Sequence, residues 1–334
     1  MPTAIAGGAI AGGLIADVVI IDGLSFALPL LIIAIGGIYS ERSGVTNLAL
    51  EGLLGFGAFC GGLFVALFGT RFAIGSTAPM YLAFLCAMVG GAAYSLLHAL
   101  LCVQFRANQV ISGVVVNIVS VALTGFLTSQ INASVFGAPS NKFVLSVSPR
   151  VTINSFSQIP VLGAVFTNFY PFEAISLIMV VILWYIMNRS RYGMRLRACG
   201  DNPHAADAAG AHVTRTRFAA VMFSGALSGF GGMCFAYSIS NNFSPSIYMG
   251  AGYLAIAALI FGNWKIMPTF AACLIFGLAR SGAYQLVKAM ELSSSFSDLA
   301  MTIPYILTLL LLIFFSRSNR APRALGEIYD KSKR

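Results

Sequence analysis

The stretch RSRYGMRLRACGDNPHAADAAGAHVTRTR, Arg189 to Arg217, is a polar, basic island in an otherwise apolar chain. It holds six of the twenty Lys and Arg residues: Arg189, Arg191, Arg195, Arg197, Arg215 and Arg217. Short loops rich in Lys and Arg stay on the cytoplasmic side of a membrane. Asn202 as N-cap, Pro203 at the first helical position and Gly210 as the stop predict a short helix. Such a helix on the inner face of a membrane bundle is suited to docking a soluble partner.

The composition around this island is that of a membrane protein. Of 334 residues, 58% are hydrophobic and only 9% are charged, which excludes an ordinary soluble domain. The net charge of +9 could suggest nucleic acid, but cations gathered in cytoplasmic loops explain it better, so we expect no nucleic-acid partner. The six cysteines lack close pairing and indicate buried apolar side chains instead of disulfides or metal ligands.

Nine apolar runs are long enough to be membrane spans: 24–40, 47–68, 79–103, 108–131, 172–188, 215–240, 246–262, 267–288 and 299–316. Residues 4–21 form a tenth apolar segment, which we expect to be either a short first span or an interfacial helix. The fold class is therefore an all-α bundle of about nine or ten spans. The run 246–262 is barely long enough and contains Gly250, Gly252 and Gly262, which predicts a broken or re-entrant helix.

Charge fixes the expected orientation. With residues 189–217 inside, alternation leaves four cations outside, namely Arg71, Lys142, Arg150 and Lys288, and places Arg280 within a span. The other fifteen cations fall inside, as the positive-inside rule requires. We therefore expect one transmembrane domain over 1–334, with an external loop at 132–171 and a cytoplasmic tail at 317–334.

Charged side chains within spans normally face the bundle interior. Glu51 lies about 8 Å from the cytoplasmic end of its span, one helical turn after Asn47. We expect Glu51 either to brace a broken segment around Ser43–Asn47 or to contact a solute. Arg280 lies about 20 Å into its span, so it is not expected to pair with Glu51. It either lines a cavity or braces neighbouring helices.

One span carries an unusual run of polar side chains. Asn108, Gln109, Ser112 and Asn117 follow Arg106, at spacings that bring several of them to one helix face. A transported polar solute needs such hydrogen-bonding groups along its path. Hydrogen bonds between helices are the alternative interpretation.

The sequence contains no catalytic or metal-ligating constellation and no GxxxxGK[ST] loop, so the chain is not expected to be an enzyme or to bind ATP alone. A secondary transporter or channel working alone is the main alternative from another class. Coupling to an ion would need intramembrane carboxylates, and Glu51 is the main candidate.

Several segments together resemble a known family: IGGIYSERSGVTNLALEGLLGFGAF (35–59), ANQVISGVVVNIV (107–119), YGMRLRACGDNPHAADAAGAHV (192–213), GAGYLAIAALIFGNW (250–264) and APRALGEIYDK (321–331). They resemble the permease subunits of nucleoside and simple-sugar ATP-binding-cassette importers, related to branched-chain amino acid and ribose permeases. The short length and the tail are similar to the second permease of nucleoside systems. Two departures are Ala211, where the family usually has isoleucine, and residues 1–21.

The resemblance implies a complex in a bacterial cytoplasmic membrane. A second, different permease would share the pathway, and an ATP-binding subunit with two nucleotide sites would hold ATP and Mg²⁺, leaving no cofactor on this chain. An external lipoprotein or periplasmic protein would deliver the solute. The family's coupling pattern corresponds here to Arg195, Arg197, Gly200, Asn202, Ala205, Ala206 and Gly210. Nucleosides are the expected solute, ahead of simple sugars and riboflavin-like compounds.

Overall fold

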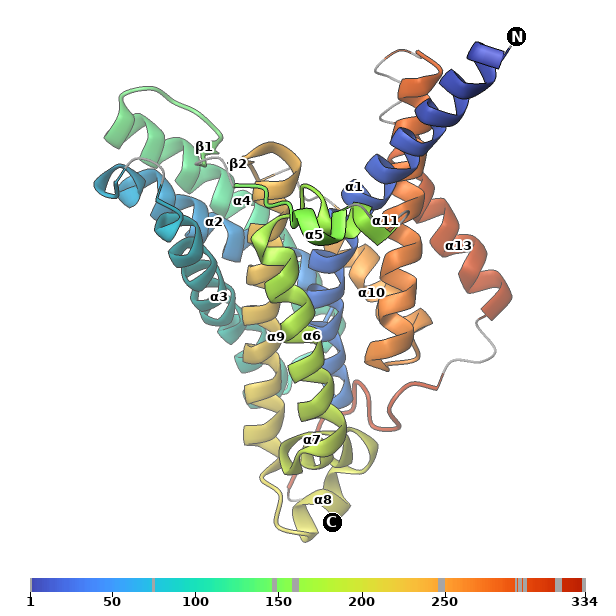
Figure 1. Ribbon diagram of the computed structural model, residues 1–334. Coiled ribbons are helices and arrows are strands. Elements are labelled where there is room, and N and C mark those ends of the chain that lie inside the picture. The colour runs from blue at the N-terminus through green and yellow to red at the C-terminus, as the bar shows by residue number, and fades with distance from the viewer. Residues whose placement is uncertain are drawn as a thin grey trace.

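A computed structural model describes residues 2–73, 76–145, 149–157, 162–245, 250–291, 293, 296, 299–315 and 320–331. The described part is a helical bundle, which confirms the predicted fold class (Figure 1). Seven helices in this part of the chain are long and apolar enough to cross a membrane. They are α1 (Pro2–Arg42), α2 (Leu50–Phe68), α3 (Ala78–Ala99), α4 (Gln109–Phe136), α6 (Pro171–Arg189), α9 (Val213–Phe235) and α11 (Ile266–Ala289).

Two further apolar helices are shorter than a full span. They are α10 (Ala251–Phe261) and α13 (Ile303–Phe315). The eleven residues of α10 extend about 16 Å, which is half of a hydrocarbon core about 30 Å thick. Gly250, with φ of 97°, precedes this helix, and Gly262 ends it. The short helix predicted in 246–262 is confirmed, although 246–249 lie outside the described residues.

The expectation of a separate segment at 4–21 was wrong. These residues continue without a break into α1, whose beginning projects away from the bundle in Figure 1. Neither Asp22 nor Gly23 breaks the helix. The Asp22 carboxylate instead accepts a hydrogen bond of 3.3 Å from the Gln285 amide of α11. A polar residue that has a partner on a neighbouring helix is thus compatible with a continuous span.

Glycines allow three helices to pack at backbone contact. Gly57 of α2, Gly91 of α3 and Gly229 of α9 meet where these helices cross. A Cβ added to Gly229 would lie 2.1 Å from the Ala87 carbonyl oxygen, and one added to Gly57 would lie 2.3 Å from Gly229 Cα. Because apolar surface gains little from leaving lipid, such close van der Waals packing is a main source of helix association. The seam places α9 at the centre of the bundle.

The segment between α4 and α6 is ordered by short elements. It contains β1 (Phe143–Val144), α5 (Asn154–Ser157) and the 3₁₀ helix η3 (Leu162–Phe166). β1 pairs antiparallel with β2 (Asn242–Phe243), which follows η4 (Ala236–Ser240), so the loop is attached to the end of α9. α4 continues to Phe136, five residues into the expected loop, and residues 146–148 lie outside the description.

The opposite end of the bundle carries α7 (Arg191–Asp201) and α8 (Pro203–Ala208), which lie beneath α6 and α9 in Figure 1. Two other short helical turns are η1 (Gly69–Arg71) and η2 (Leu100–Gln104), which extend α2 and α3. Residues 43–49, between α1 and α2, are not helical and are mostly buried. Non-helical backbone at membrane depth is tolerated only where protein satisfies its polar groups.

Candidate functional site

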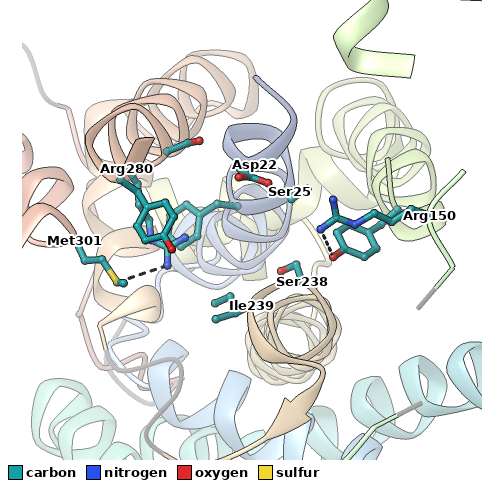
Figure 2. A pocket seen from close by; sticks show the side chains of 11 residues that line it. Asp22, Ser25, Arg150, Ser238, Ile239, Arg280 and Met301 are labelled. Carbon is teal, nitrogen blue, oxygen red and sulfur yellow. Dashed lines mark hydrogen bonds between the residues drawn. The ribbon is translucent and has the colours of Figure 1, made fainter. Parts of the chain in front are cut away.

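A cavity of about 280 Å³ opens between α1, α11, η4 and the segment before α6 (Figure 2). Its lining is mixed: charged and hydroxyl groups alternate with aromatic side chains. The lining residues are Asp22, Ser25, Phe26, Arg150, Tyr170, Ser238, Ile239, Arg280, Ser281, Tyr284 and Met301. Charges are expensive within a bundle, so a cavity that gathers them is a candidate for binding.

Arg280 dominates one side of this cavity. Its guanidinium carbon lies 4.4 Å from the centre of the Phe26 ring, a cation–π geometry, and one nitrogen lies 4.0 Å from the Met301 sulfur. Figure 2 shows Arg280 and Arg150 at opposite sides, with Asp22 and Ser25 of α1 between them. Arg280 thus lines the cavity and also contacts α1 and the segment before α13. Both sequence interpretations of Arg280 agree with its position.

A second cavity of about 230 Å³ shares Phe26, Ile239, Arg280 and Met301 with the first. It extends toward the beginning of α10 and is closed by Tyr305 of α13. Ligand pockets usually measure about 300–1,000 Å³, so either cavity alone is small and the two together reach that range. Arg280 and Phe26 stand where the two spaces meet.

Besides its two arginines, the first cavity is lined by one carboxylate, Asp22, by Ser25, which is bonded to a second carboxylate outside the lining, and by an unpaired hydroxyl. Ser25 donates to the buried Glu173 carboxylate at 2.6 Å. Asp22 is bonded to Gln285, as described above. The Ser281 hydroxyl is buried and has no hydrogen-bond partner within the described chain. An unsatisfied buried hydroxyl that lines a cavity is available to a bound solute.

Glu51 caps the broken helix α10. Its two carboxylate oxygens accept hydrogen bonds from the backbone N–H groups of Gly250, at 2.7 Å, and Gly252, at 2.6 Å. A carboxylate at a helix N-terminus neutralises the exposed N–H groups and the positive end of the dipole. The brace that we expected Glu51 to supply to Ser43–Asn47 is therefore supplied to α10 instead. The misassignment arose because sequence could not place α10 beside α2.

Asn117 and Asn47 hold the non-helical segment between α1 and α2. The Asn117 amide oxygen accepts from Gly52 N–H at 2.7 Å, and its nitrogen donates to the Leu48 carbonyl at 2.8 Å and to the Tyr253 hydroxyl at 3.1 Å. Asn47 donates to Ser224 of α9 at 2.9 Å. These contacts link α2, α4, α9 and α10 and satisfy backbone groups that the broken segment leaves exposed.

Gln109 and Ser112 extend the same network toward the end of the bundle that carries α7 and α8. The Gln109 amide oxygen accepts from Thr46 N–H at 2.7 Å, and Ser112 is 2.9 Å from a ring nitrogen of His98. Asn108 is not on the span wall, because it is the N-cap of α4 and accepts from Val110 and Ile111 N–H. The structure thus brings Asn47, Gln109, Ser112 and Asn117 together around residues 43–49, while Arg280 lies apart in the first cavity, which the predicted orientation places toward the outer side. Their roles toward a solute stay predictions.

The short helix predicted after Asn202 is present as α8, and its coupling role stays a prediction. Asn202 accepts a hydrogen bond of 3.0 Å from Ala205 N–H, Pro203 opens the helix, and Gly210 follows it with φ of 84°. Ala206 packs inward, whereas Asn202 and Ala205 are exposed. Arg195 is exposed on α7, and Arg197 donates to the Met187 carbonyl. A Cβ added to Gly200 would lie 2.2 Å from the Arg42 carbonyl, so this glycine lets α7 rest directly on the end of α1.

Residues 320–331, which we name the strap, cross this end of the bundle. Ala324 N–H donates to the Gly200 carbonyl at 2.8 Å, and Gly326 N–H donates to the Gly44 carbonyl at 3.1 Å. Tyr329 packs on the ring of His204, with ring centroids 5.3 Å apart. At the far end, Asp330 forms a 3.0 Å ion pair with Arg106. The strap therefore ties α7 and α8 to the turns that precede α2 and α4.

Arg217 is the buried centre of this arrangement. Its guanidinium donates to three backbone carbonyls, those of Ser43 (3.0 Å), Glu327 (2.7 Å) and Cys199 (3.4 Å). Sequence reasoning counted Arg217 only as a cytoplasmic charge and also missed Asp22, Ser25 and Arg150 in the cavity. Asp17 and Asp22 are the two carboxylates in the long apolar run 4–40, which was the available signal for Asp22; no local pattern marks the others.

The amino-acid sequence is similar to known proteins over nearly its whole length. Residues 19–315 match the family described as the permease component of branched-chain amino acid transport systems. The guanosine ABC transporter permease protein NupQ of Bacillus subtilis is 37% identical over 313 residues, covering 93% of this chain and 96% of the relative. The nucleoside ABC transporter permease protein NupC of Lactococcus lactis is 37% identical over 321 residues, covering 95% and 98%.

A more distant relative is the guanosine ABC transporter permease protein NupP of Bacillus subtilis. It is 26% identical over 314 residues, covering 91% of this chain and 82% of the relative. No solved structure matches the chain. The full-length matches, together with the seven long apolar helices, establish a multi-pass membrane protein.

Proposed function

The chain belongs to the family of permease components of branched-chain amino acid transport systems, and from this premise we propose that it is one permease subunit of an ATP-driven nucleoside importer. The observation that carries the proposal is the 37% identity over 93% of the chain with a guanosine permease, joined by an equal identity with a nucleoside permease. Similarity over nearly the whole length includes the cavity as well as the coupling end.

The proposed assembly has four kinds of subunit. A second permease, different from this one, shares the pathway; NupQ and NupP in one organism both resemble this chain, which supports a pair of unlike permeases. A separate ATP-binding subunit with two nucleotide sites holds ATP and Mg²⁺ and docks on α7 and α8. An external lipoprotein or periplasmic protein delivers the solute. The exposed basic surface around Arg191 and Arg195 supports the docking side of this proposal.

The lining of the first cavity, on the predicted outer side, supports the proposal that the solute is neutral and combines a flat base with hydroxyl groups. Phe26 and Tyr284 offer aromatic surface, while Ser25 and Ser281 offer hydroxyls and Arg280 offers N–H donors. Glu51, through the α10 N-terminus, sets the position of the second cavity's wall. We place Asn47, Gln109, Ser112 and Asn117 beneath, where they keep the broken segment in shape for passage. Weak binding is expected, because the external protein supplies affinity.

The test is uptake of labelled guanosine by cells that lack their own nucleoside uptake and express this chain with its partner subunits. Arg280→Gln removes the charge at the junction of the cavities and should lower uptake several-fold while the complex still assembles. Arg71→Gln, a cation on η1 away from both cavities, is the matched control and should change little. Normal uptake by Arg280→Gln would show that Arg280 is not part of the solute pathway.

A second arm separates this function from a transporter working alone. The purified chain in liposomes should not accumulate guanosine under an ion gradient. Accumulation without ATP or partner subunits would establish the secondary-transporter alternative. Uptake of a simple sugar in place of guanosine by the complete complex would keep the ATP-driven importer and change its solute.

A further inference from the structure

Both tryptophans of the chain, Trp184 and Trp264, line one cavity at the end of the bundle that carries α7 and α8. The cavity measures about 240 Å³ and lies where α1 and α6 end and α11 begins. Tryptophan is enriched at the level of lipid headgroups, because its ring is apolar and its N–H is polar. Three membrane helices, α1, α6 and α11, end or begin here, which also places the cavity at the level of the headgroups. The cavity therefore lies at the interface between hydrocarbon and water on the predicted cytoplasmic side.

Three cations line this cavity: Arg42, Arg197 and Lys265. None of its lining residues is a carboxylate. The charges of Arg42 and Arg197 repel each other, and Asp201 is the acid that attracts Arg42. Glu41 is buried behind the wall and accepts the Trp264 indole N–H.

The balance of charge favours an anion. If Glu41 and Asp201 are both counted as ionised, one positive charge still remains in excess, and it faces the cavity.

The two guanidinium groups are held in place before any ligand arrives. Arg42 Nε donates to the Trp264 carbonyl at 3.0 Å, and one Arg197 nitrogen donates to the Met187 carbonyl. A guanidinium carries five N–H donors in a planar fork, so each of these contacts uses only part of its capacity. Forks of this kind bind phosphate oxygens well. The Lys265 side chain is exposed and adds a third cation to the lining.

We propose that this cavity binds the phosphate headgroup of an anionic phospholipid of the cytoplasmic leaflet. A lipid fits better than free phosphate because apolar surface continues from the cavity into the membrane region. Val181 and Tyr185 of α6 are 62% and 60% exposed, and Met267 of α11 is 50% exposed. Acyl chains would cover this surface while the headgroup meets the cations. The proposal concerns the inner leaflet and does not depend on which solute is transported.

The experiment uses the full-length chain in detergent, with retained phospholipid measured by native mass spectrometry. Phosphatidylglycerol should be retained in preference to phosphatidylcholine. Lys265→Gln should weaken phosphatidylglycerol binding about fivefold, the equivalent of about 1 kcal/mol for one cation near the surface. Lys288→Gln is the matched control, because it makes the same change at the exposed opposite end of α11. It should leave retention unchanged, and Lys265→Arg should preserve binding.

Three results would overturn the proposal. Equal retention of the two lipids would show no headgroup recognition, and an equal loss in both glutamine variants would show only general attraction to the surface. Full displacement by inorganic phosphate at millimolar concentration would identify a free-anion site instead. Melting of lipid-free Lys265→Gln should match the parent chain, so that lost binding is not confused with lost folding.

Discussion

Glu51 determines how α10 begins, and its effect is separable from solute binding. Glu51→Ala leaves the partly buried N–H groups of Gly250 and Gly252 without acceptors, at a cost of up to about 1–3 kcal/mol each. We expect a clearly lower melting temperature, measured by loss of the monodisperse peak on size-exclusion chromatography after heating. Glu51→Gln keeps one acceptor oxygen, so its melting temperature should lie between those of the parent chain and of Glu51→Ala. If melting is unchanged but uptake is lost, Glu51 contacts the solute instead.

Gly200 is the residue on which α7 meets α1. Gly200→Ala places a methyl group against the Arg42 carbonyl, so α7 must shift away from the bundle. Since the shift alters the position of α8, we expect ATP hydrolysis by the complex to continue while uptake per ATP falls several-fold. Gly210→Ala is a useful comparison. Its added Cβ meets nothing within 4 Å, so only the strain of its positive φ acts. If uptake per ATP is normal in Gly200→Ala, then the contact between α7 and α1 is not needed to transmit motion from the ATP-binding subunit.

At the scale of elements, the strap should control access to the small apolar cluster that α7, α8 and the start of α9 form beneath it. Cys199 is buried beneath the strap, and burial raises the pKa of its thiol, so less thiolate is present at neutral pH. Tyr329→Ala removes the ring that packs against Cys199, Ala206 and Val213. We expect alkylation of Cys199 by a maleimide, followed by peptide mass spectrometry, to become at least several-fold faster, and uptake to fall.

Ile328→Ala is the control for this experiment, because Ile328 lies in the same strap but is 51% exposed. It should leave both alkylation and uptake nearly unchanged. Slow alkylation of Cys199 in the Tyr329 variant would mean that α7 and α9 protect the thiol without the strap. In every variant the alkylation rate should increase with pH, since the thiolate is the reactive form.

Elements with local signals were predictable from sequence. The cap, proline and glycine of α8 act within nine residues, and these local rules hold in the structure. The short α10 was equally marked by its glycines. The continuity of α1 was not predictable, because Asp22 resembles a boundary until the Gln285 partner on α11 is known. The same limit applies to Asn117, whose polar neighbours come from three other segments of the chain.

For the whole molecule, the two ends of the bundle differ in what their polar residues do. The end with the first cavity gathers Arg280, Asp22 and Arg150 around open space, whereas the end with α7 and α8 uses Arg217 and the strap to satisfy backbone carbonyls. Periodicity identifies the apolar helices but not which polar groups face each other. A closely packed end at α7 and α8 and a hollow opposite end are compatible with the proposed importer, in which motion of a partner, applied at α8, opens or closes the cavities.

Orientation is the prediction that all of these proposals share. The positive-inside rule places α8 in the cytoplasm and the segment after α4 outside. Ser140→Cys, in an exposed turn of that segment, should react with a membrane-impermeant maleimide on intact cells. His204→Cys, exposed on α8, should react only after the membrane is opened. The parent chain supplies the background from its own cysteines. The reverse pattern would put α8 on the side without ATP, and no ATP-binding subunit could then dock on it.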